Sequence, residues 1–451
     1  MIAIKLIRER IGGHAARLLA LATVLAAPVA AQTAEPEAPP QYFAIHAQST
    51  FEDQATLAFT SPYRGANSLD PAARGRETFD ATLFVGARPW RGAQIWIAPE
   101  VDQGFGLSNT LGLAGFSSGE AYKVGKAAPY VRLQRAFIRQ TIDLGGQSET
   151  VDADFMHLRG RQSANRLVIT LGKVSVTDIF DANDFAHDPR GDFMNWSLID
   201  AGSFDYAADA WGYSTGGAVE WYQGRWTARA GVFNLSVAPN SEVLEKSFGQ
   251  FQMLGEIEHR HTIRGKPGTL KVTGFLSRGR MATFDDAVRL GLATGATPNV
   301  ADVRHYRSRA GVSANLQQQI TDSLGVFARA GVSDGRYESY EFTDIDRTVS
   351  AGVSLKGAAW GRKADTIGFA GVMNGISDAH RRYLAAGGLG ILVGDGRLPH
   401  PGLEGILETY YSCAPVGPAR ITLDYQFVNN PAYNRDRGPV SIVAARVHAQ
   451  F

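Results

Sequence analysis

The sequence is poor in three features that mark common protein classes. Cys413 is its only cysteine, so an internal disulfide framework is excluded. Charged residues make up only 20% of the chain and the formal net charge is +1, whereas nucleic-acid binders carry a marked basic excess. Beyond residue 31 no apolar run reaches the length of a membrane-spanning helix. A disulfide-stapled domain, a nucleic-acid binder and a helical membrane protein are therefore not expected.

Residues 1–31 have the pattern of a secretory signal peptide. Lys5 and three arginines precede the apolar run LLALATVLAAPVA, and Val29 and Ala31 form a small-x-small cleavage site. Cleavage after Ala31 is expected to leave a single mature domain, residues 32–451. It removes four of the 45 Lys and Arg and one of the 44 Asp and Glu, which leaves 41 basic and 43 acidic residues and a net charge near −2.

The final segment, SIVAARVHAQF, alternates between two kinds of side chain. Val443, Ala445 and Val447 alternate with Ala444, Arg446 and His448. Side chains alternate sides along a strand, so one face of this segment is apolar. An exported chain without membrane helices can span a bilayer only as a closed β-barrel. The segment is therefore expected to present an apolar stripe to outer-membrane lipids, to close against the first strand, and to engage the barrel-assembly machinery through Phe451.

Alternating segments of about ten residues recur along the chain and are joined by short turns such as PWRG at 89–92. A first count gives seventeen, but both termini of such a barrel face the periplasm, which requires an even number. Assigning residues 149–159, ETVDADFMHLR, to a periplasmic connection leaves sixteen strands from near Phe43 to Phe451. The sequence therefore predicts an all-β, 16-stranded antiparallel transmembrane β-barrel in the outer membrane. Long external loops are expected near 53–77, 103–130, 178–211, 236–248, 280–307, 334–346, 375–403 and 429–438.

Several long stretches, including FTSPYRGANSL, DIFDANDFAHDPRGDFMNW and YQFVNNPAYNRDRGPVS, resemble the carbohydrate-selective porins of the OprB type from Gram-negative outer membranes. The resemblance runs through essentially all of the mature chain. It implies a sixteen-stranded barrel and a channel for diffusion of glucose-like monosaccharides or small oligosaccharides. It leaves the subunit number open between a monomer and a homotrimer.

The external loop at 178–211 is rich in aspartate, and the resemblance implies that it folds into the lumen as the constriction. Asp184, Asp188, Arg190 and Trp196 are expected to line the pore there. Carboxylates accept hydrogen bonds from sugar hydroxyls, and an aromatic ring packs on the CH face of a sugar. The alternative is that the aspartates bind the loop's own backbone.

Charged residues at inward positions of the strands are the second set of candidate pore-lining groups. On the lipid face each would cost about 2–4 kcal/mol, so they are expected to point inward. Guanidinium donors and carboxylate acceptors both suit sugar hydroxyls. The alternative is that the two kinds pair with each other and stiffen the wall. The set comprises Arg135, Arg139, Arg229, Arg309, Arg329, Glu100, Glu220, Glu256, Glu408 and Asp424.

No cofactor is expected. Asp181, Asp184, His187 and Asp188 offer ligands that could hold a structural calcium ion, but they lack the spacing of a calcium-binding loop. A general or anion-preferring porin is an alternative, because inward arginines attract anions. A barrel enzyme or a surface adhesin is a further alternative, although an enzyme would need a nucleophile, a base and an orienting acid within hydrogen-bond reach of one another.

Overall fold

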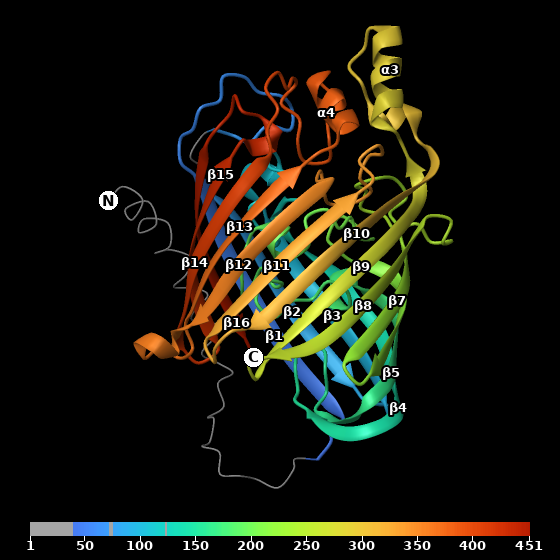
Figure 1. Ribbon diagram of the computed structural model, residues 1–451, viewed down its shortest axis with the longest axis vertical. Coiled ribbons are helices and arrows are strands. Elements are labelled where there is room, and N and C mark those ends of the chain that lie inside the picture. The colour runs from blue at the N-terminus through green and yellow to red at the C-terminus, as the bar shows by residue number, and fades with distance from the viewer. Residues whose placement is uncertain (1–38, 72–74, 122–123) are drawn as a thin grey trace. The chain divides into compact units, whose positions relative to one another are not determined.

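The computed structural model describes residues 39–71, 75–121 and 124–451, so the expected signal peptide lies outside the described residues. The chain divides into two units, Met1–Pro40 and Gln41–Phe451. The second unit is a closed antiparallel barrel of sixteen strands, as the alternation predicts (Figure 1). The strands are β1 (Phe43–Thr56), β2 (Arg76–Ala87), β3 (Ala93–Gly104), β4 (Lys126–Val151), β5 (Gly160–Val174), β6 (Ser214–Gln223), β7 (Trp226–Asn234), β8 (Phe251–Ile263), β9 (Lys266–Met281), β10 (His305–Gln319), β11 (Leu324–Ser333), β12 (Arg347–Lys356), β13 (Thr366–Gly375), β14 (Glu404–Val416), β15 (Ala419–Asn429) and β16 (Val440–Gln450).

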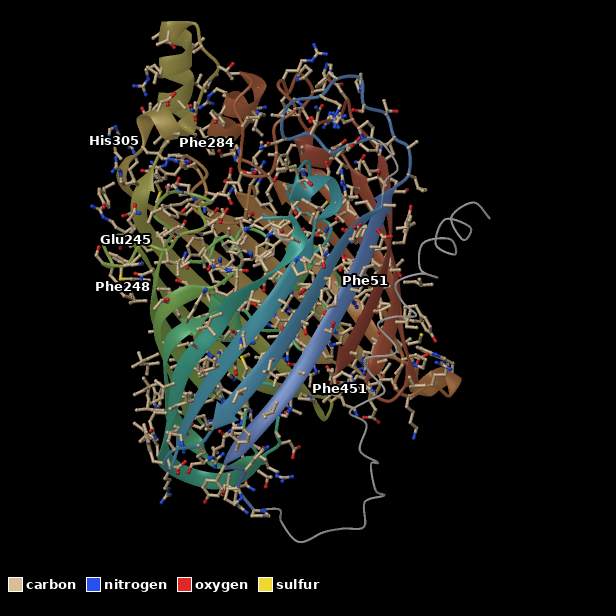
Figure 2. The ribbon with its side chains drawn as sticks, turned by 180° about the vertical axis from the view of Figure 1, so that it is seen from behind. Phe51, Glu245, Phe248, Phe284, His305 and Phe451 are labelled. Carbon is tan, nitrogen blue, oxygen red and sulfur yellow. The ribbon has the colours of Figure 1, made fainter. Side chains whose placement is uncertain are left out.

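The last strand closes the barrel against the first. Every strand pairs with its neighbours in the sequence, and β1 pairs with β16 in a register that places Phe51 opposite Val447. Beyond β16, the backbone N–H of Phe451 donates to the Ala47 carbonyl at 2.8 Å, and the Ala47 N–H donates back at 3.1 Å. Figure 2 shows β1, in blue, beside this end of the chain. The predicted closure is confirmed, and the terminal phenylalanine is part of the seam.

The two faces of the wall separate as the sequence predicts. On β7, Trp226 and Val232 are exposed on the outside, whereas Thr227 and Phe233 are buried inside the barrel. On β16, Arg446 is buried and Val447 is exposed. Inward side chains are covered mainly by loop residues within the barrel, so the core of this protein lies in the lumen.

Short and long connections alternate around the barrel in the predicted order. Residues 149–151 extend β4, and residues 152–159 form the connection to β5 at the short-turn end of the barrel. The long connections are 57–75, 105–125, 175–213, 235–250, 282–304, 334–346, 376–403 and 430–439. They carry η1 (Leu107–Thr110), η2 (Val176–Asp178), α2 (Trp196–Ile199), α3 (Phe284–Thr294), η3 (Val300–Val303), α4 (Asp378–Ala385) and η5 (Pro431–Tyr433), whereas η4 (Gly357–Trp360) follows β12 at the other end. Figure 1 shows α3 and α4 together at the long-loop end. None of the helices in the described ranges has the length and hydropathy to cross a bilayer.

Candidate functional site: the luminal third loop

The third long loop, residues 175–213, connects β5 to β6 and crosses the interior of the barrel. The Ala207 N–H donates to the Gln252 side chain on β8 at 2.9 Å. The Asn195 N–H donates to Glu408 on β14 at 3.0 Å. These two strands lie well apart around the barrel, so the loop spans the lumen between them.

The loop is held inside the barrel partly by its own apolar side chains. Phe180, Phe193 and Phe204 are fully buried, and Phe193 packs against Phe327 of β11 with ring centroids 5.6 Å apart. Trp196 is only 3% exposed and stacks on Phe116 of the second loop at 5.2 Å. The predicted pore-facing ring of Trp196 is therefore covered in this structure, because it packs against another loop.

Three of the predicted arginines fasten the wall to this loop. Arg135 on β4 makes a bidentate pair with Asp178, at 2.8 and 2.7 Å. Arg309 on β10 donates to Asp205 at 2.8 Å, and both side chains are fully buried. Arg329 on β11 lies 3.3 Å from Asp181 and donates to the carbonyl oxygens of Leu198 and Ala186, at 2.8 Å each. These residues follow the alternative in which inward arginines and acids pair.

The other two predicted arginines bind the wall and the periplasmic connection. Arg229 on β7 donates to Glu220 at 2.9 Å, Glu256 at 2.6 Å and Glu258 at 2.8 Å. Arg139 on β4 donates to the carbonyl oxygen of Met156 at 2.8 Å. Arg139 therefore holds the connection between β4 and β5 against the wall.

The predicted acids accept hydrogen bonds from protein groups. Glu408 receives the N–H groups of Met194 and Asn195, at 2.5 and 3.0 Å, and Glu256 receives that of Asp181 at 2.8 Å. Glu100 accepts from the Thr82 hydroxyl at 2.6 Å, and Asp424 accepts from the Gln426 side-chain amide at 3.2 Å. Glu256 and Glu408, like Arg135, Arg309 and Arg329, therefore support the third loop.

The exposed charged groups of the loop lie at its turn around residues 184–190. Asp184 is exposed and accepts from Gln317 of β10 at 2.6 Å. The Asp188 side chain is 53% exposed. Arg190 is largely buried and lies 3.1 Å from Glu120, and 3.5 Å from both Asp80 and Glu100. Asp184 and Asp188 are therefore the predicted loop residues with carboxylates open to solvent.

Burial and neighbouring charges shift the pKa values of two aspartates of the loop in opposite directions. Burial raises the pKa of Asp192 to about 6, and the nearby Asp188 carboxylate acts in the same direction. Burial would also raise the pKa of Asp178, but the Arg135 guanidinium outweighs it and holds that pKa below its usual value. Asp178 therefore stays ionised over the physiological range, while the pKa of Asp192 lies at about 6.

Three residues of the site were not among the predicted pore-lining groups. Arg446 of β16 donates to the Asp192 carbonyl at 3.1 Å and to that of Pro189. In the sequence, Arg446 alternates with the apolar residues of the terminal strand. This alternation could have identified it as an inward-facing residue. Asp80 alternates with threonines on β2, which could have marked it as inward, whereas Glu120 lies in an irregular loop and has no local signal.

The suggested calcium ligands do not form one cluster. Asp181 faces Arg329 and Asp184 faces Gln317. Within the three described ranges, no group of three His, Cys, Asp or Glu side chains has the arrangement of a metal site.

The residues that build this loop and wall match a known family. The model of the carbohydrate-selective porins, OprB family, matches residues 66–451. The chain belongs to this family. This porin is similar in fold to OprB of Pseudomonas putida, with 16% identity over 91% of this chain and 94% of that one and a TM-score of 0.68. It is also similar to the outer membrane channel DcaP of Acinetobacter baumannii, with 10% identity over 92% and 99% and a TM-score of 0.51. No curated protein sequence matches the chain.

Family and fold together fix the class of activity. The protein is an outer-membrane β-barrel channel of the sugar-selective class and not an enzyme. The luminal loop and its supporting wall are the candidate site for selection of the solute.

Proposed function

We propose that this porin passes glucose-like, uncharged sugars by passive diffusion, and that the third loop forms the constriction at which they are selected. Membership of the carbohydrate-selective family supports the substrate class. A sixteen-stranded barrel is wide enough for an aqueous channel unless something narrows it. The third loop, anchored on both sides of the lumen, is the element that narrows it.

The main observation that supports the proposal is that most of the predicted inward arginines are paired with carboxylates. Four of the five predicted arginines lie within 3.3 Å of a carboxylate: Arg135, Arg229, Arg309 and Arg329. A guanidinium already neutralised by a carboxylate attracts a passing anion weakly. The open groups of the loop, Asp184 and Asp188, are hydrogen-bond acceptors that suit sugar hydroxyls and repel anions. This arrangement favours a neutral polyol over the anion-preferring alternative.

The test is single-channel conductance of the purified protein in a planar bilayer, titrated with glucose, other sugars and small anions. Saturable block by glucose, with little block by unrelated solutes, is the expected result. Open current without any sugar block would contradict the proposal and favour a general porin, and no current at all would favour the adhesin alternative.

A double variant tests whether the third loop selects the solute. Replacing both aspartates, Asp184→Asn with Asp188→Asn, is expected to weaken glucose block and to reduce cation preference in reversal-potential measurements. Asp378→Asn is the matched control, because Asp378 is an exposed aspartate on the external helix α4. Equal effects of the two changes would show that general surface charge, and not the loop, governs selection.

A further inference from the structure

A groove on the outer wall of the barrel lies over β10 to β13. Its volume is about 450 Å³, and its lining includes Val312, Ala330, Val349 and Met373. Their side chains point outward, because the alternate residues on the same strands, such as Ser313 and Asn374, are buried inside. The small side chain of Ala330 leaves a hollow between the larger valine and methionine side chains. An apolar groove on this face has the chemistry to hold an acyl chain.

One arginine also lines this groove. Arg347 is the first residue of β12 and pairs across the sheet with Val332 on one side and Gly375 on the other. It is exposed, and a Cβ atom at Gly375 would come within 2.7 Å of its Nε atom, so its side chain lies across that glycine. Below it on the outward face of β12 stand Val349, Ala351 and Val353. Arg347 therefore marks the outer edge of the apolar band.

Two more arginines occupy the same outward rim. Arg278 and Arg280 are exposed near the long-loop end of β9, above the outward residues Val272 and Leu276. Arg278 lies 6.0 Å from the ring of Tyr306, itself 55% exposed. Among the residues that the structure describes, no carboxylate lies within ion-pair distance of Arg278, Arg280 or Arg347.

The basic rim is local and does not run around the barrel. At the corresponding end of β1 and β2, the outward residues include Asp53 and Glu77 instead. The inward Arg135, Arg229, Arg309 and Arg329 are paired with acids, whereas these outward arginines are not. Arginine is the side chain best suited to bidentate binding of phosphate. An unpaired arginine at the edge of the apolar band is therefore placed to meet a lipid headgroup.

We propose that this face, over β9 to β13, is a binding site for a phosphorylated glycolipid of the outer leaflet, with one acyl chain in the groove and phosphate groups on Arg347 and on the Arg278 and Arg280 pair. The distance between the arginines of the rim determines which headgroup can contact them at the same time. Arg278 and Arg347 stand three strands apart and are offset by four residues along the strand direction, which places their Cα atoms roughly 20 Å apart. A single phosphodiester cannot bridge that distance, whereas two phosphates at opposite ends of a disaccharide can each meet one of the two long guanidinium side chains.

The test is native mass spectrometry of the delipidated full-length protein titrated with diphosphoryl lipid A. Arg347→Gln is expected to weaken binding about fivefold, and Arg278→Gln with Arg280→Gln at least as much, from the interaction of each arginine with an anionic headgroup. Ala330→Leu, which fills the groove, is expected to weaken binding without a change of charge. Resistance of the folded barrel to denaturation by detergent verifies that each variant is folded.

Lys356→Gln is the matched control, because it removes an exposed positive charge from the opposite end of the same strand. Its binding is expected to stay within about twofold of the original protein. Equal loss in the Lys356 and Arg347 variants would overturn the site in favour of diffuse electrostatic attraction. Equal binding of dephosphorylated lipid A or of phosphatidylglycerol would overturn the assignment of the headgroup.

Discussion

Arg309 and Asp205 form a fully buried ion pair inside the barrel, with 2.8 Å between the Arg309 Nη1 and Asp205 Oδ2 atoms. Asp205 also accepts from the backbone N–H groups of Tyr340 and Glu341, at 2.7 and 2.9 Å. One carboxylate thus joins the third loop, strand β10 and the loop before β12. The pair is one of the points at which the lumen is fixed.

Removing the arginine of this pair is expected to destabilise the barrel strongly. Arg309→Ala leaves the Asp205 carboxylate buried without its guanidinium, and such a loss costs about 3–5 kcal/mol. Equilibrium unfolding in detergent micelles measures the change. The control is Arg336→Ala, since Arg336 forms an exposed pair with Asp334 and such pairs contribute about 0–1 kcal/mol. Similar losses in both variants would contradict the structural role of the buried pair.

Arg135→Ala and Arg139→Ala are expected to change sugar flux without loss of the barrel. The first frees Asp178 at the start of the third loop, and the second frees the Met156 carbonyl of the periplasmic connection. A less firmly held constriction should raise conductance and weaken sugar block, each by about twofold. Liposome swelling with graded sugars gives the flux. Unchanged flux and block in both variants would show that these arginines do not control the path of the solute.

Deletion of Phe451 is expected to impair membrane insertion more than channel selectivity. The residue contributes the last pair of backbone hydrogen bonds between the chain end and Ala47 of β1. Its loss shortens the seam and removes the terminal aromatic side chain that we expect the assembly machinery to bind. Outer-membrane levels are compared with those of Phe451→Tyr, which keeps the ring and the backbone bonds. Normal levels of the truncated protein would refute this prediction.

Cation preference is expected to rise with pH as Asp192 ionises. Its pKa is raised to about 6, so the side chain is neutral below that pH and carries a negative charge above it. Asp178, with its lowered pKa, contributes no step in this range. Reversal potentials measured between about pH 5 and pH 7 follow the change. Asp192→Asn should reduce the step, and a step of unchanged size in the variant would assign it to another group.

The alternation of side chains was enough to predict the wall of the barrel. The period of two, the parity of the strand number and the order of short and long connections depend only on local sequence and on the membrane as a solvent. The same reasoning predicted that the side chains of Arg229, Arg309 and Glu408 point inward, because a charged side chain facing lipid costs free energy.

The partners of those inward groups could not be read from the sequence. Arg309 and Asp205 are more than a hundred residues apart, and nothing local links Glu120 to Arg190. Trp196 has an aromatic ring of the kind that packs on sugars, but Phe116 covers it. This contact forms only when the second and third loops meet inside the barrel.

The class of fold, the number of strands and the side chains that face the lipid all follow from local periodicity and from the cost of exposing polar groups to a bilayer. The folded barrel was needed to show which charges neutralise one another, which carboxylates of the third loop are open to solvent, and which outward arginines have no acidic partner. Those properties depend on contacts between segments distant in the chain, and local patterns carry no information about such distances.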